Sequence, residues 1–176
     1  LGLIGGAILD LYSSGLALIS VGVPVKRHVA ASIDAVIMAL GTIYIVWIAK
    51  DFFGPFQGFL ITLGVPIAAW SAIFVADVFM RKRDFKEEDL FNPKGIYGAW
   101  NLRSLSLVAV GAIVGWGFVT NTFASWLSWQ GYFLGLIGGK DGEWAYSNIG
   151  VIFALLIGFF GHIILAKKTI AKQESF

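Results

Sequence analysis

The sequence predicts an all-α membrane protein with five transmembrane helices, and three observations support this prediction. Of the 176 residues, 57% are hydrophobic and 14% are charged, whereas soluble domains contain about 45–50% and about 25%. The apolar residues form runs of about 18 residues or more, long enough for a helix to cross a hydrocarbon core about 30 Å thick. The runs are continuous and do not alternate between polar and apolar positions, as the strands of an outer-membrane barrel would.

The basic residues between the apolar runs predict the orientation of the chain. Five spans are expected at residues 1–21, 29–49, 58–80, 104–122 and 149–166, with an interfacial segment at 123–139 and a tail at 167–176. Of the 13 Lys and Arg residues, 2 lie in the first connection, 6 in the third and 3 in the tail. Because basic connections stay in the cytoplasm, we expect a multi-pass protein of the cell (plasma) membrane with a cytoplasmic C-terminus.

In the first span, Asp10 lies about 16 Å from the cytoplasmic end of the helix, near the bilayer midplane. An ionisable side chain at this depth costs about 3 kcal/mol unless it is paired or faces a cavity, so it indicates function. Gly6, Ser13 and Ser14 lie one turn away on the same face. We expect these four residues to bind substrate, although the serines and the glycine could instead be packing residues between membrane helices.

The second span also contains a carboxylate, Asp34, which lies close to the cytoplasmic end of its helix. Lys26, Arg27 or a water-filled crevice could satisfy the carboxylate at that depth. We therefore interpret Asp34 as structural.

The third span contains Pro66, which has no N–H to donate to the carbonyl of Thr62, so the helix is expected to bend there. Such a bend could serve as a gate, with Pro66, Thr62 and Gln57 as gate residues. The alternative is an ordinary proline kink filled by a neighbour, since Pro and Gly are common in membrane helices.

The remaining polar and small residues of the spans are interpreted as structural. Asp77 and Arg81 have the i,i+4 spacing of an ion pair that fixes a helix end. Gly111 and Gly115 form a small-xxx-small pair, which predicts close helix packing. His162 lies near the last boundary and is expected to reach the interface.

The segment 123–139 is rich in aromatic residues, including Trp126, Trp129, Tyr132 and Phe133. A sixth span there would move the tail lysines to the outer side. We therefore expect an aromatic helix that lies at the outer interface, where Trp and Tyr are common.

Motifs for catalysis and cofactor binding do not appear in the sequence. The chain has no cysteine, and neither histidine has partners at metal-ligand spacing. Phosphate loops and nucleophile elbows are also missing. We expect no enzyme activity, no metal and no nucleic-acid partner, which leaves a transporter or a small membrane-embedded structural or assembly subunit.

Several segments of the sequence resemble one known transporter family. These segments are Asp10-Leu11-Tyr12-Ser13-Ser14-Gly15-Leu16, Gly64-Val65-Pro66, Ile73-Phe74-Val75-Ala76-Asp77, Arg81-Lys82-Arg83, Asp89-Leu90-Phe91, Gly95-Ile96-Tyr97-Gly98 and Trp100-Asn101-Leu102-Arg103. Together they resemble the C-terminal part of the nucleobase-cation symporter family, which includes the purine-cytosine permeases and carriers of allantoin, hydantoin and uracil.

The resemblance implies a fold, a partner and a substrate. The five spans would be the last five of twelve helices in two inverted five-helix repeats around a midplane site. The N-terminal part of the same transporter would be the partner of this chain, which we expect to be a fragment because it starts without Met. Asp10 would stand where the family's eighth helix offers a polar side chain to the base, and a carboxylate could accept two N–H groups of a nucleobase-like substrate.

The resemblance also bears on the coupling cation, H⁺ or Na⁺. In sodium-coupled relatives, a hydroxyl pair precedes this polar residue by somewhat more than one turn. The matching positions here fall among Ile4, Gly5 and Gly6, which have no hydroxyl. Proton coupling through Asp10 is therefore favoured, although backbone carbonyls beside Gly5 and Gly6 could still bind a cation.

Overall fold

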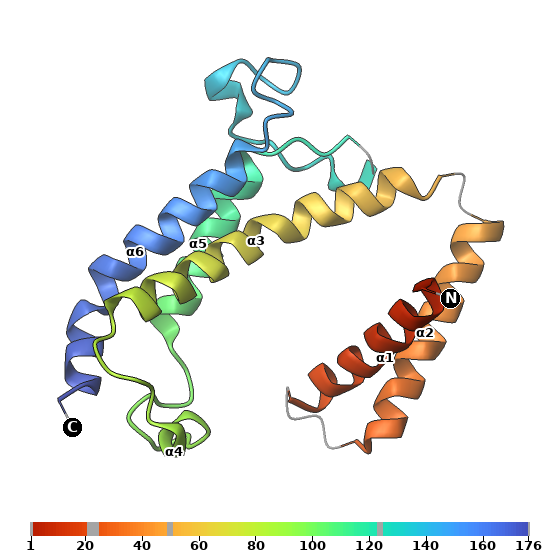
Figure 1. The fold of residues 1–176 in the computed structure, drawn as a ribbon. Coiled ribbons are helices and arrows are strands. Elements are labelled where there is room, and N and C mark those ends of the chain that lie inside the picture. Colours follow the sequence, from red (N-terminus) through yellow and green to blue (C-terminus); the bar gives the residue numbers. More distant parts are fainter. Residues whose placement is uncertain (1, 21–24, 49–50, 123–124, 176) are drawn as a thin grey trace. The chain divides into compact units, whose positions relative to one another are not determined.

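The computed structural model describes residues 2–20, 25–48, 51–122 and 125–175. Over these residues the chain is helical and contains no strand (Figure 1). Its elements are α1 (Gly2–Ser20), α2 (Arg27–Trp47), α3 (Phe53–Met80), α4 (Glu87–Leu90), α5 (Leu102–Gly117), η1 (Ser125–Leu127), η2 (Leu134–Ile137) and α6 (Ile149–Gln173). The all-α class expected from the sequence is confirmed.

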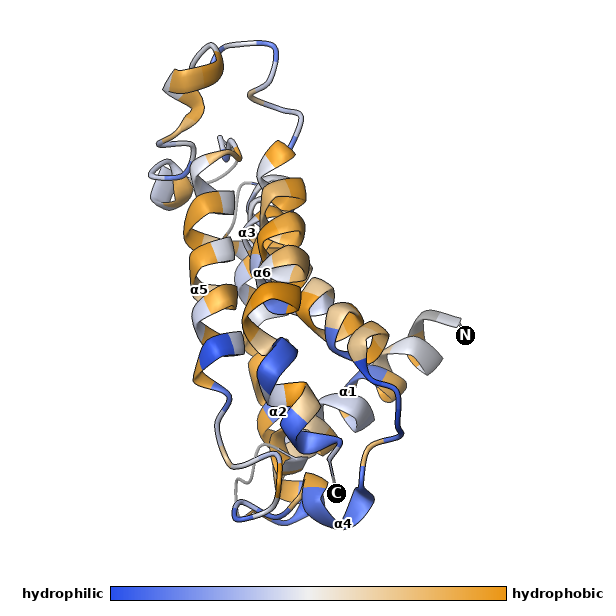
Figure 2. Cartoon of the chain, turned by 90° about the vertical axis from the view of Figure 1, so that its left-hand side faces the viewer, coloured by the Kyte–Doolittle hydropathy of each residue, from blue (hydrophilic) through white to orange (hydrophobic). Residues whose placement is uncertain are grey.

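Five apolar helices occupy the five expected spans. The helices α2, α3 and α6 are long and apolar enough to cross a membrane, whereas α1 and α5 are shorter apolar helices. In Figure 2 the bodies of α3 and α5 are mainly hydrophobic, and hydrophilic residues gather around α4 and at the C-terminal end of α6. The chain is therefore an all-α membrane protein.

Three boundaries differ from the expected spans by about five residues or more. Helix α3 begins at Phe53 rather than at residue 58, and α5 ends at Gly117 rather than at residue 122. Helix α6 continues to Gln173, so most of the expected tail is helical. The lysines of this last part do not end the helix, because their long side chains can reach water and positive charge is favourable at a helix C-terminus.

The aromatic segment after α5 does not form the single interfacial helix that we expected. It contains the short 3₁₀ helices η1 and η2 joined by turns, and residues 123 and 124 lie outside the described part. Three glycines of the segment have positive φ angles, 79° at Gly131, 111° at Gly138 and 83° at Gly139. Such angles end a helix and favour glycine, and the N–H of Gly131 donates to the carbonyl of Trp116 at 2.8 Å.

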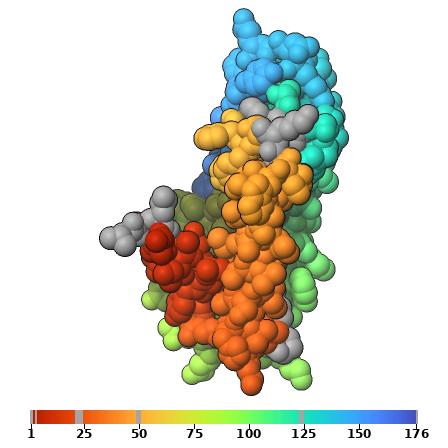
Figure 3. Space-filling model, turned by 90° about the vertical axis from the view of Figure 1, so that its right-hand side faces the viewer, coloured from red at the N-terminus to blue at the C-terminus, as the bar shows by residue number. Residues whose placement is uncertain are grey.

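The chain divides into two compact units, Leu1–Phe52 and Phe53–Phe176. In the first unit, here called the N-terminal hairpin, α1 and α2 pack side by side (Figure 3). The contact is close because Gly15 faces Ala31, whose backbone nitrogen would lie 3.4 Å from a Cβ at Gly15. Small residues thus set the distance between the two helices.

In the second unit, here called the three-helix unit, α3, α5 and α6 pack against one another. Helix α6 buries every fourth residue along one stripe, and most of these residues are small. The stripe consists of Gly150, Ala154, Gly158, His162, Ala166 and Ile170.

The small residues of this unit bring helix backbones into contact. A Cβ at Gly158 of α6 would lie 2.4 Å from the carbonyl oxygen of Ala69 in α3, and one at Gly115 would lie 2.8 Å from that of Gly150. The close packing expected at Gly111 and Gly115 is present, since a Cβ at Gly111 would lie 2.9 Å from the Cβ of Ala69. The unit is therefore held by backbone proximity, which only glycine permits at these positions.

Replacing Gly158 with Ala is expected to lower the melting temperature of the protein in detergent. The new Cβ would overlap a backbone carbonyl that cannot move alone, and overpacking of this kind costs about 1–3 kcal/mol. Differential scanning fluorimetry measures the change. The matched control is Gly64→Ala, because a Cβ at Gly64 would meet nothing within 4 Å, and equal melting temperatures of the two variants would contradict the packing described.

Candidate functional site

The polar face predicted on α1 is exposed in the N-terminal hairpin. Asp10, Ser13, Gly6 and Gly5 all lie at exposed positions of this helix. A Cβ at Gly5 or Gly6 would meet nothing within 4 Å, so the face leaves room for a ligand or for another helix. At membrane depth an ionisable side chain on such a face needs a polar partner from outside the hairpin.

Ser14 lies apart from this face and lines a pocket between α1 and α2. The pocket has a volume of about 340 Å³ and is lined by Ser14, Ala17, Leu18, Ala30, Ile33, Asp34 and Ile37. Both of its polar residues, Ser14 and Asp34, are half-buried. Arg27 instead donates from Nη2 to the hydroxyl of Tyr12 at 2.8 Å and stacks over that ring. Asp34 therefore lies in a crevice between α1 and α2, which is one of the environments expected for it.

The backbone carbonyl in α3 that receives no hydrogen bond from Pro66 receives one from a side chain of α5. The oxygen of Thr62 accepts a hydrogen bond from the indole Nε1 of Trp116 at 2.8 Å, and α3 continues through the proline as one helix. A neighbour thus supplies the hydrogen bond that Pro66 cannot make, as the structural alternative expected. Gln57 is exposed, and a gating role for Pro66, Thr62 and Gln57 stays a prediction.

A buried polar cluster that we did not expect lies beside this kink. Asn121 is 3% exposed and Gln130 is 1% exposed. The amide of Asn121 donates to the carbonyl of Gly58 at 2.9 Å, and that of Gln130 donates to the hydroxyl of Thr62 at 2.8 Å. These contacts tie the segment after α5 to the first half of α3. No local pattern in the sequence indicates these contacts, because Asn121 was expected at the end of the fourth span and Gln130 in the interfacial segment, where an amide is expected to face water.

The ion pair expected between Asp77 and Arg81 is present, with 2.7 Å between Nε and Oδ2. His162 of α6 is a third member, since its Nε2 lies 3.1 Å from Oδ1 of Asp77. The ring of His162 is only 2% exposed, so our expectation that it reaches the interface is wrong. Its position in register with Gly158 and Ala166 was the signal that could have revealed its burial.

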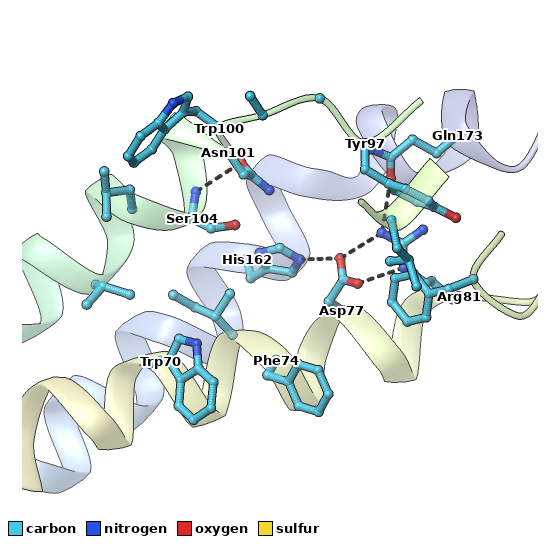
Figure 4. A pocket seen from close by; sticks show the side chains of 17 residues that line it. Trp70, Phe74, Asp77, Arg81, Tyr97, Trp100, Asn101, Ser104, His162 and Gln173 are labelled. Atoms are coloured by element: carbon cyan, nitrogen blue, oxygen red, sulfur yellow. Dashed lines mark hydrogen bonds and ion pairs between the residues drawn. The ribbon is translucent and has the colours of Figure 1, made fainter. Parts of the chain in front are cut away.

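Arg81 also binds the C-terminal end of α6 (Figure 4). Its Nη2 donates to Oε1 of Gln173 at 3.0 Å. The guanidinium lies 4.4 Å from the ring centre of Phe85 and 5.5 Å from that of Tyr97, and both are favourable cation–π distances. One arginine therefore holds together the end of α3, the end of α6 and the loop between α3 and α5.

Glu174 adds a second link between the end of α6 and this loop. Its carboxylate accepts hydrogen bonds from the backbone N–H of Lys82 at 2.6 Å and of Arg83 at 3.1 Å. The bond from Lys82 is the main cause that holds the pKa of Glu174 below its ordinary value. The link is therefore complete above the ordinary pKa of a glutamate and is lost as the pH falls through the lowered pKa.

A pocket of about 730 Å³ opens beside Asp77 and His162 (Figure 4). Most of its lining is aromatic or aliphatic, with Trp70, Ile73, Phe74, Phe85, Leu90, Tyr97, Trp100, Leu105 and Val108 among the residues. Asn101, which also lines it, caps α5 by accepting a hydrogen bond from the N–H of Ser104 at 3.2 Å. Because Asp77 and Arg81 are paired with each other, the charges that reach this pocket are already satisfied.

The described residues offer no metal site. Their His, Asp and Glu side chains form no group of three or more that could hold a metal ion. Asp77 and His162 do approach each other, but the third member of their cluster is Arg81, which is not a metal ligand.

Replacing Trp116 with Phe is expected to lower the melting temperature of the detergent-solubilised protein. The half-buried Thr62 carbonyl would lose its donor, and loss of such a hydrogen bond costs about 1 kcal/mol. The control is Trp129→Phe, which changes a tryptophan that is 48% exposed and packs edge-on against Trp116. Should both variants melt at the same temperature, the indole of Trp116 does not have the role assigned to it.

Comparison with known proteins adds an independent finding. Residues 2–145 match the family described as "Permease for cytosine/purines, uracil, thiamine, allantoin". Comparisons with curated proteins and with solved structures gave no match. The matched region contains α1 to α5 and ends before α6, and it includes the exposed face of α1 and the Asp77–Arg81 pair. The match covers more than half of the chain, which therefore belongs to the family of permeases for cytosine, purines, uracil, thiamine and allantoin.

Proposed function

We propose that the chain forms part of a secondary transporter that imports a nucleobase or a related heterocycle by cation symport. Membership of a permease family supports this class of substrate and favours transport over a structural or assembly subunit. The observation that carries the proposal is the exposed carboxylate of Asp10 on an apolar helix. Ionisable residues inside membrane helices mark substrate and ion pathways.

Asp10 has the chemistry to bind a nucleobase. Its two oxygens can accept hydrogen bonds from ring and amino N–H groups, and the negative charge strengthens them. Ser13 can add a hydroxyl, and Gly6 leaves space beside the carboxylate. In this proposal, helices of the same transporter that precede this chain cover the face and supply the aromatic rings that stack on the base.

The proposed coupling ion is a proton, which Asp10 can carry, because Gly5 and Gly6 have no hydroxyl for a sodium ion. The proposed location is the plasma membrane with a cytoplasmic C-terminus, as the distribution of Lys and Arg favours. The proposed gate is the first half of α3, where Pro66 and Thr62 lie beside the segment that follows α5.

Asp10→Asn in the complete transporter is expected to slow nucleobase uptake about 30-fold. The substitution removes charge-assisted hydrogen bonding of about 2 kcal/mol and also the proton site. Uptake of radiolabelled cytosine, adenine, uracil and allantoin into cells, measured over a range of pH, tests this expectation.

The matched control is Asp141→Asn, which removes the same charge from an exposed loop. The control is expected to transport normally. Normal uptake by the Asp10→Asn variant at every pH would refute the role of Asp10.

A further inference from the structure

We propose that Asp34 accepts the proton that Asp10 releases and passes it to the end of the N-terminal hairpin where α1 and α2 are connected. The inference rests on the proposed function and adds a second ion-coupling residue to it. Its basis is the pocket of about 340 Å³ between α1 and α2, in which Asp34 and Ser14 are the polar lining residues.

Ser14 and Asp34 lie at about the same depth in the hairpin, and Asp10 lies deeper. Ser14 precedes the end of α1 at Ser20 by 6 residues. Asp34 follows the start of α2 at Arg27 by 7 residues. At a rise of about 1.5 Å per residue, both lie about 9–11 Å from the connected end of the hairpin, and Asp10 lies about 15 Å from it. The pocket therefore lies between Asp10 and that end.

A proton on Asp10 needs intermediate groups to cover this distance. Each transfer spans one hydrogen bond of about 2.6–3.2 Å or one bridging water. Ser14 lies one turn from Asp10 but on the pocket side of α1, so in this proposal a water bridges the two side chains, and the Ser14 hydroxyl can both accept and donate a proton. The pocket volume of about 340 Å³ exceeds the roughly 30 Å³ of one water several times. The Ser14 hydroxyl, waters in the pocket and the Asp34 carboxylate can thus carry the successive proton transfers.

Among the described residues of the hairpin, no ionisable residue other than Asp34 is part of the pocket lining. On α1, Tyr12 is engaged by Arg27. On and before α2, Lys26 and His28 are exposed at the connected end. Asp34 is therefore the ionisable residue that lines this pocket.

The transfer balances in atoms and charge. The O–H bond of the protonated Asp10 carboxyl breaks, and a water or the Ser14 hydroxyl receives that proton while giving up another. An O–H bond forms on the Asp34 carboxylate. Asp34 then gives the proton to bulk water, so both carboxylates end ionised and one positive charge has left the site.

The variant Asp34→Asn in the complete transporter tests the inference, because Asn keeps the shape of Asp but cannot take the proton. Two rates are measured in the same cells. One is net cytosine uptake driven by a proton gradient, and the other is exchange of internal unlabelled for external labelled cytosine, which needs no net proton release. Net uptake is expected to fall about 100-fold, a typical effect of losing a positioned proton-transfer group, while exchange stays at the wild-type rate.

Two further variants sharpen the test. Asp34→Glu keeps a carboxylate and is expected to restore net uptake. Asp84→Asn, on an exposed loop, is expected to change neither rate.

Unchanged net uptake in Asp34→Asn, or an equal loss of exchange and net uptake, would overturn the inference. Failure of the proposed function has a different signature, because the wild-type transporter itself would then neither accumulate nor exchange cytosine.

Discussion

Every polar group held at membrane depth needs a partner, and this constraint explains how the chain is built. In the three-helix unit the partners are internal, because Asp77 binds both Arg81 and His162. In the N-terminal hairpin they are not, because Asp10 is exposed on α1 and Asp34 faces a pocket. The contrast separates a unit that pairs its membrane-depth carboxylate internally from a helical face whose carboxylate would take its partner from a substrate or a proton under the proposed function.

Contacts at several positions along the helices stabilise the three-helix unit. Glycines such as Gly158 let the backbones of α3 and α6 touch, so the helices gain contact that lipid cannot replace. Trp116 and Gln130 tie the start of α3 to α5 and to the segment that follows it. At the other end, Glu174 fixes the basic loop to α6.

The sequence predicted what depends on local pattern. Hydropathy and helix periodicity were enough for the all-α class, for the apolar helices and for the pair of Asp77 with Arg81. Contacts between distant segments could not be predicted, because no local pattern links Trp116 to the carbonyl of Thr62 or His162 to Asp77. The aromatic segment was mispredicted because its composition suggested a helix while its glycines form turns. The role predicted for Asp10 rests on its depth in the helix, which does not require knowledge of its neighbours, and it stays a prediction.

The accessibility of position 10 tests the account most directly. The chain has no cysteine, so Asp10→Cys introduces one thiol into it at the proposed site. In the complete transporter, with any other cysteines replaced, a membrane-impermeant thiol reagent is expected to label this position. Cytosine is expected to slow the labelling at concentrations raised about 30-fold, which offsets the binding lost with the carboxylate. A thiol that reacts only with a lipid-soluble reagent, or whose labelling cytosine does not change, would show that this face meets lipid or protein rather than substrate.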